Sequence, residues 1–171
     1  MAWTSKTELG TLVDIELSAT INQTSPDKMM LGFYMNEIIL RLLHKHEPHP
    51  ELFDSYDETI TELFQNNGDH TVLRYFEKRL LQSLGYGVIL DQDLNTGDMI
   101  DAEKEYHYIP EVGPSSNLNN NKASVIISGQ TLLELDNEAL STNKNKNEAK
   151  ILLRKLLNQY LGNKPLASRE L

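Results

Sequence analysis

Cysteine is absent from this 171-residue sequence, and no apolar run approaches the length of a membrane span. Without thiols the chain has no disulfide, no thiolate metal site and no cysteine nucleophile. A membrane-spanning helix needs about 20 consecutive apolar residues. Residues 1–6, MAWTSK, also lack the basic-then-apolar pattern of a signal peptide. We therefore expect a soluble protein of the cytoplasm that does not enter a membrane.

Positive charge is also scarce, and it is unevenly distributed. The formal net charge is −9, which argues against a general nucleic-acid binder, because such proteins are normally basic. Residues 1–143 contain 9 Lys and Arg against 23 Asp and Glu, whereas residues 144–171 contain 7 against 2. The basic end therefore indicates either a local anion-binding face on an acidic body or a solvated, lysine-rich last helix.

The first part of the sequence predicts an extended segment followed by a helix. Residues that suit a half-buried strand stand at alternate positions: Leu9, Thr11, Val13, Ile15 and Leu17. The unpaired edge of this strand is a predicted dimerisation or aggregation site. Ser25 and Pro26 then mark the start of a helix. This helix, predicted at 26–46, is apolar on nearly every side, so we expect it to be buried at the centre of the fold.

Four further helices follow, marked by apolar residues at helical spacing: 50–65, 70–84, 129–136 and 145–161. Two short strands are expected around Tyr106 and Val125, on either side of a polar loop at 115–122. The predicted fold class is therefore mainly α, a helical bundle domain with a small β-insertion at residues 88–128.

Two groups of side chains suggest metal binding but have the wrong spacing for it. Residues 91–97 place oxygen ligands at alternate positions, as at the start of a calcium loop, but Gly97 is one place late and Ala102 occupies the twelfth position. Three histidines point in different directions or lie beyond a proline: His44, His46 and His49. We expect an acidic loop and solvated histidines, with no metal and no cofactor.

Glu37 stands out as an acid within the apolar first helix. A buried carboxyl with a shifted pKa suits catalysis, whereas the alternative is a pair with Arg41, four places on, or with a backbone group. Nothing in the sequence resembles a nucleophile elbow, a phosphate-cradling glycine loop or a metalloprotease helix. We therefore predict that the protein is not an enzyme.

The cations of the third predicted helix lie off its apolar stripe. They are Arg74, Lys78 and Arg79, and the first two are four apart on one face. They are either surface cations without a role or an anchor for a carboxylate beside exposed apolar surface. The second alternative draws on the planar fork of arginine, which binds a carboxylate through two hydrogen bonds.

Five short motifs resemble, in the same order, the RecO family of bacterial DNA repair proteins. They are GFYMNE at 32–37, EPHPELF at 47–53, LRYFE at 73–77, LGYG at 84–87 and GNKPLASREL at 162–171. The segment KTELGTL at 6–12 is also similar to the last part of that family's N-terminal domain. Each motif is short, but five in the family's order point away from chance.

The resemblance implies two parts. Residues 1–22 would be a residual strand or hairpin of a truncated N-terminal OB-fold, and residues 23–171 would be the helical C-terminal domain. Many members carry a four-cysteine zinc module after the Gly-Tyr-Gly turn. Here Asp93 and Thr96 stand near the place of the first cysteine pair, so residues 88–128 are expected to be a degenerate, zinc-free insertion. The DNA-binding groove of an OB-fold is mostly missing, and we expect DNA binding to be weakened.

By the same resemblance the protein is a recombination mediator. The family anneals complementary single strands and acts with RecR on DNA coated by single-stranded-DNA-binding protein (SSB), helping the RecA recombinase to replace that coat. Its helical domain docks the acidic, phenylalanine-ending C-terminal tail of SSB. Arg74 falls on the motif arginine that the resemblance links to the tail, Tyr34 is a nearby candidate, and Lys78 completes the predicted tail site.

The basic end of the chain supplies a second predicted site. Five cations are candidates for contacts with the phosphates of single-stranded DNA: Lys150, Arg154, Lys155, Lys164 and Arg169. The alternative function belongs to another class, a helical adaptor that binds acidic or amphipathic peptides without touching DNA. An affinity for single-stranded DNA that falls with salt would distinguish the first function from the second.

Overall fold

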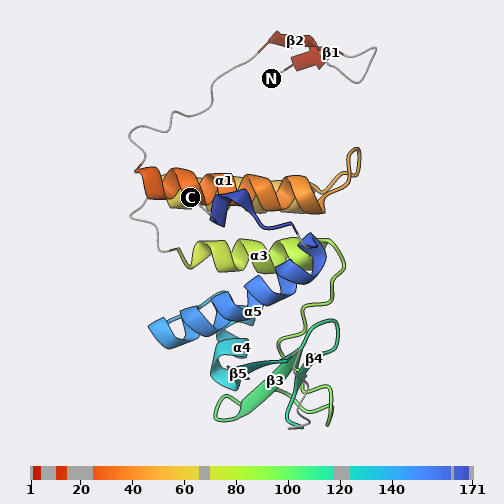
Figure 1. Cartoon of the computed structure of the whole chain (residues 1–171), viewed down its shortest axis with the longest axis vertical. Coiled ribbons are helices and arrows are strands. Elements are labelled where there is room, and N and C mark those ends of the chain that lie inside the picture. Colours follow the sequence, from red (N-terminus) through yellow and green to blue (C-terminus); the bar gives the residue numbers. More distant parts are fainter. Residues whose placement is uncertain are drawn as a thin grey trace.

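A computed structural model describes residues 2–4, 11–14, 25–65, 70–117, 124–162 and 164–169. Its elements follow the chain in this order: β1 Ala2–Thr4, β2 Thr11–Asp14, α1 Pro26–Leu42, α2 Pro50–Gln65, α3 Val72–Ser83, β3 Glu105–Ile109, β4 Gly113–Ser115, β5 Val125–Ser128, α4 Gly129–Asp136, α5 Asn143–Leu161 and the 3-10 helix η1 Ala167–Arg169. Helices predominate (Figure 1), so the predicted mainly α fold with a small β-insertion is confirmed. Within these described ranges, no helix is long and apolar enough to cross a membrane.

Helix α1 begins where the sequence predicts but is not the buried centre of the fold. The Ser25 side chain accepts a hydrogen bond from the Lys28 N–H and so caps the first turn. The helix ends at Leu42, four residues before the predicted end. Leu40 is 81% exposed and Phe33 is 54% exposed. The prediction of a helix buried on every side is therefore wrong, because α2, α5 and η1 leave part of the α1 surface uncovered.

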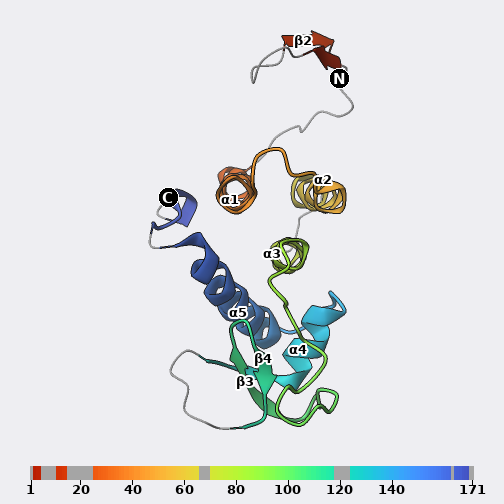
Figure 2. The ribbon, with the colours of Figure 1, turned by 90° about the vertical axis from the view of Figure 1, so that its right-hand side faces the viewer.

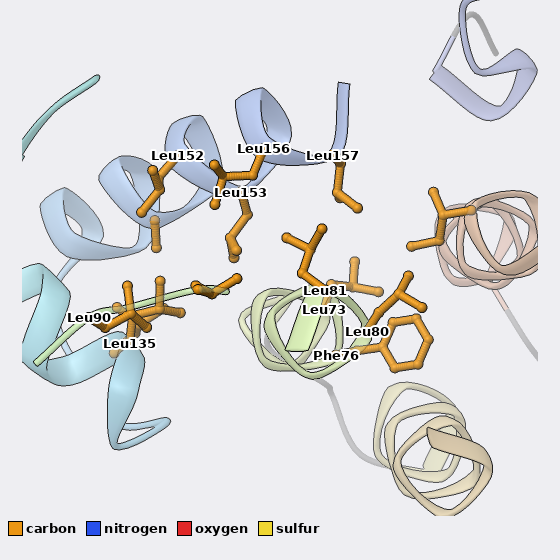
Figure 3. Close-up of a cluster of buried hydrophobic side chains, with 14 of the residues drawn as sticks. Leu73, Phe76, Leu80, Leu81, Leu90, Leu135, Leu152, Leu153, Leu156 and Leu157 are labelled. Carbon is orange, nitrogen blue, oxygen red and sulfur yellow. The ribbon is translucent and has the colours of Figure 1, made fainter. Parts of the chain in front are cut away.

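Helix α3 occupies the centre instead. Figure 2 shows it between α2 and α5, and Phe76, Leu80 and Leu81 have no exposed surface. In Figure 3 the α5 leucines Leu153, Leu156 and Leu157 lie toward α3, whereas Leu152 lies nearer Leu90 and Leu135. Truncation of a buried leucine to alanine costs about 2–5 kcal/mol, so this α3–α5 contact contributes strongly to the stability of the bundle.

The β-insertion forms a three-stranded antiparallel sheet in the order β4-β3-β5. Strands β3 and β5 were predicted, whereas β4 was missed because it contains Gly113 and Pro114, which are poor strand formers. Helix α4 follows β5 without a loop. Its first residue, Gly129, passes so close to Asp101 that an added Cβ would lie 2.0 Å from the Asp101 carbonyl oxygen, so only glycine fits there. Part of the polar loop predicted at 115–122 lies outside the described residues.

At the N-terminal end β1 and β2 pair as an antiparallel hairpin, with Thr4 opposite Thr11. Figure 1 shows this hairpin apart from the helices. Three residues of the predicted alternation lie outside the described ranges: Leu9, Ile15 and Leu17. The assignment of residues 1–22 to an OB-fold remnant, and the domain boundary that follows it, stay predictions.

Candidate functional site

A buried cluster of three polar side chains joins α1 to α3. Arg74 and Glu77 lie one turn apart on α3, so they share a face, and Arg74 Nη1 is 2.7 Å from Glu77 Oε2. The Tyr34 hydroxyl of α1 donates to Glu77 Oε1 at 2.5 Å. Glu77 has no exposed surface, and a buried carboxylate persists only when it is paired. The pair holds the Arg74 guanidinium in one orientation.

Two adjoining hollows open beside this cluster, with volumes of about 290 and 280 Å³. They share Leu31, Leu73, Arg74 and Arg154, so we treat them as one feature, the Arg74 cleft. Its lining is Met30, Leu31, Tyr34, His70, Thr71, Leu73, Arg74, Asn143, Lys146, Asn147, Lys150, Arg154 and Ser168. Helices α1, α3 and α5 thus contribute apolar surface and several cations to the same cleft.

The electrostatics of the cleft favour an anion. Lys150 and Arg154 are four apart on α5 and so are neighbours on its surface. The pKa of Lys150 is lowered, first by the charge of Arg154, then by partial burial and by Arg74, while Glu77 acts in the opposite direction. Lys150 therefore feels the repulsion of Arg154 and Arg74, and a bound anion would relieve it.

Hydrogen bonds join the segment after α5 to α1, and this segment forms one side of the cleft. Arg41 donates to the carbonyls of Leu161 (2.9 Å) and Lys164 (2.5 Å). Glu37 accepts hydrogen bonds from the Ser168 N–H at 2.9 Å and the Ser168 hydroxyl at 2.7 Å, and its carboxylate is 3.7 Å from Arg41. These bonds, chiefly from the Ser168 backbone, lower the pKa of Glu37. Of the two alternatives for Glu37, the structure shows the pair with Arg41 and the backbone.

Lys78 points away from the cleft although it is four residues after Arg74. Its ammonium lies 3.0 Å from Glu138 Oε1 and donates to the Asp136 carbonyl at the end of α4, 2.8 Å away. Arg79 also pairs with Glu138, and this contact raises the pKa of Arg79. These two cations join α3 to α4. A direct contact between Lys78 and a peptide tail stays a prediction.

The predicted DNA contacts whose side chains the structure describes do not all face the same way. Lys150 and Arg154 line the cleft with Arg74. Lys155 turns to the sheet, where its ammonium donates to the Ser124 carbonyl at 3.2 Å. Lys164 is exposed in the segment after α5, and the side chain of Arg169 is outside the described part of the chain.

In the acidic loop that begins at residue 91, backbone N–H groups donate hydrogen bonds to the carboxylate of Asp93. Asp93 is only 3% exposed and accepts hydrogen bonds from the N–H groups of Asn95 at 2.8 Å and Ser116 at 3.3 Å. Burial opposes its ionisation, but the bonds from Ser116 and Asn95 outweigh it and lower the pKa of Asp93. The carboxylate thus stabilises a turn. Across the described ranges, no group of three or more His, Cys, Asp or Glu side chains is arranged to hold a metal ion.

Sequence reasoning missed Glu77 as a member of the site. The available signal was its position three residues after Arg74, which places both on one face of a helix. It was not used because a glutamate is normally exposed, and its burial depends on α1 covering it.

Comparison with known proteins identifies one family. The family model for the Recombination protein O C terminal matches residues 23–170, which include α1 through η1 and the whole Arg74 cleft. The DNA repair protein RecO of Nitrosospira multiformis is 36% identical over 172 residues, covering 100% of this chain and 71% of the relative. Proteins of the same name from Azoarcus sp. (36% over 172 residues; 99% and 71%) and Coxiella burnetii strain RSA 331 (34% over 173 residues; 100% and 74%) are similar to it as well.

Proposed function

We propose that this chain, which belongs to the RecO family, serves in recombinational DNA repair. We also propose that its Arg74 cleft binds the C-terminal tail of SSB. The observation that carries the proposal is the convergence of Arg74, Lys150 and Arg154 around the apolar floor of Leu31 and Leu73. An acidic peptide that ends in phenylalanine has the complementary chemistry, carboxylates for the cations and a ring for the floor.

The dimensions of the cleft support this occupant. A cavity of about 150 Å³ lined with apolar side chains binds benzene, so each hollow, at about 290 and 280 Å³, has room for a phenyl ring. The terminal carboxylate would then lie beside Arg74. Because Glu77 and Tyr34 already fix the orientation of Arg74, little side-chain entropy is lost when the tail binds.

The position of Lys150 and Arg154 also bears on the predicted DNA contacts. If both cations bind the tail, they are unavailable to phosphates at the same time. We therefore propose that tail and single-stranded DNA compete for this part of α5, and that Lys155, Lys164 and Arg169 are the remaining candidates for DNA. Assistance to annealing and to RecA loading together with RecR, in the cytoplasm, is the wider role that the family resemblance supports.

A titration of a fluorescent acidic peptide ending in phenylalanine, followed by anisotropy, tests the tail site. A charge-assisted hydrogen bond contributes about 1.5–3 kcal/mol, so Arg154→Gln is expected to weaken binding roughly tenfold to hundredfold. Lys155→Gln is the matched control, because Lys155 is the next residue of α5 but donates to the Ser124 carbonyl. An unchanged affinity in Arg154→Gln, or equal losses in both variants, would overturn the assignment.

The second candidate function is a peptide-binding adaptor that does not touch DNA. It is favoured by the net charge of −9 and by the separation of the predicted DNA contacts. Titration of labelled single-stranded DNA at two salt concentrations distinguishes the two functions. Phosphate contacts require an affinity that falls as salt rises, whereas an adaptor would bind the tail peptide and leave the DNA free.

A further inference from the structure

A groove separate from the Arg74 cleft lies between the second half of α1 and the first half of α2. Its volume is about 600 Å³, about twice that of either hollow of the cleft. Its walls are mainly apolar: Ile39, Leu40, Leu43, Leu52, Phe53 and Tyr56. We name it the α1–α2 groove. Two of these side chains are unusually open to solvent, with Leu40 81% and Phe53 70% exposed, and contiguous apolar surface of this kind marks interaction sites.

The groove has the geometry of a seat for a third helix. On α1 its wall follows Asn36 and Leu40, which are four apart on one face, and Leu43 continues the wall just after the helix end. The same face continues toward the helix start through Phe33 and Met29, which are 54% and 48% exposed. From Met29 to the end of α1 at Leu42 this side of the helix is about 20 Å long at 1.5 Å per residue. A helix of about four turns with anchors at i, i+4, i+7 and i+11 matches this length.

Charge around the groove is negative. Helix α2 contains no Lys or Arg but has five exposed acids: Glu51, Asp54, Asp57, Glu58 and Glu62. Burial raises the pKa of Tyr56, the hydrogen bond to Asn36 opposes this shift, and the charge of Asp57, one turn after Phe53, adds to it. Glu47 lines the groove at its other end. Of the nearest cations, Arg41 holds the segment after α5 and Lys45 lies in the exposed loop between the helices.

We propose that the α1–α2 groove docks an amphipathic helix of a partner protein whose apolar face is flanked by Lys and Arg. Apolar anchors would cover Leu40 and Phe53, and the flanking cations would lie beside Glu47 and Asp57. This partner has the opposite charge to a peptide suited to the Arg74 cleft. The two sites therefore bind different partners and do not compete.

The probe is a fluorescent 18-residue synthetic peptide with Leu at i, i+4, i+7 and i+11 and Lys or Arg beside them. A shuffled peptide of the same composition controls for general attraction to an acidic protein. Anisotropy is measured with wild type, Leu40→Gln, Phe53→Gln and Asp57→Asn. Ile126→Gln on β5 is the matched control, because Ile126 is 61% exposed and lies on another element.

We expect binding of the amphipathic peptide at least tenfold tighter than that of the shuffled one. Leu40→Gln and Phe53→Gln should each reduce it about tenfold, Asp57→Asn should reduce its dependence on salt, and Ile126→Gln should leave it unchanged. Equal binding of both peptides, or full affinity in Leu40→Gln and Phe53→Gln, would overturn the proposal. Sedimentation velocity tests whether a second copy of this chain occupies the groove instead. A wild-type dimer that becomes a monomer in Leu40→Gln would show this, and it would also overturn the proposal.

Discussion

Replacement of Arg74 probes the cleft only if its effect on stability is separated from its effect on binding. In Arg74→Ala the fully buried Glu77 keeps the Tyr34 hydroxyl but loses the charge of the Arg74 guanidinium 2.7 Å away. Removal of one partner of a buried ion pair costs about 3–5 kcal/mol, against a total stability of about 5–15 kcal/mol for a typical domain. Weak tail binding by Arg74→Ala would therefore reflect partial unfolding as well as a missing contact.

A second substitution separates the two effects. Glu77→Gln has nearly the same shape and can still accept a hydrogen bond from Tyr34, but it carries no charge. Arg74→Ala/Glu77→Gln is therefore expected to recover about 0.5–3 kcal/mol relative to Arg74→Ala, the range of coupling energies between residues in contact. It is not expected to recover tail affinity, because the guanidinium is still absent.

The measurement is a double-mutant cycle by urea denaturation, followed by tail titrations under conditions in which every variant is folded. A loss below about 1 kcal/mol in Arg74→Ala, or additive effects in the double variant, would refute the buried pair. Full tail affinity in the stable double variant would refute the role of Arg74 in binding.

Two further predictions concern the core and the polar contacts of α4. Leu80→Ala should lower the free energy of unfolding by about 2–5 kcal/mol in urea denaturation, because Leu80 has no exposed surface; a loss below 1 kcal/mol would contradict its central position. The pKa of Glu134 is lowered to about 2, since bonds from Asn145, Gln130 and Ser141 outweigh the opposing effect of burial. A depressed carboxyl stabilises the fold above its unfolded pKa of about 4.3 and loses this contribution as the pH falls toward 2. The stability advantage of wild type over Glu134→Gln should therefore shrink between pH 6 and pH 2, and a constant difference would contradict these bonds.

Local signals in the sequence predict where helices and strands lie better than they predict which faces of them are buried. The cap at Ser25 and the apolar spacing of α3 and α5 placed these helices correctly. The predicted end of α1 at residue 46 was too late: a proline such as Pro48 disfavours helix in the residue before it and so sets only an outer limit, whereas the backbone already becomes extended at Leu43. Burial was also misjudged, since an apolar surface indicates a partner but does not show whether this chain supplies it.

The candidate site illustrates the same limit. The motif match supplied Arg74 and Tyr34, while Lys150 and Arg154 were predicted from charge alone and assigned to DNA. The structure brings all four together because α5 crosses α3 and α1 at this point. The crossing depends on tertiary packing of leucines far apart in the chain, which no local pattern specifies.

The hydrogen bonds that Glu37 accepts from, and Arg41 donates to, the segment after α5 have a kinetic consequence. They join residues 120 to 131 positions apart, and closure of so long a loop has a large entropic cost that contacts must offset. We expect these bonds to form late in folding, after the α3–α5 core. An intermediate that has folded only that core would have Arg74 and Arg154 in place but would lack the wall that Ser168 provides. Hydrogen exchange at the Ser168 N–H would then report when the last wall of the cleft closes.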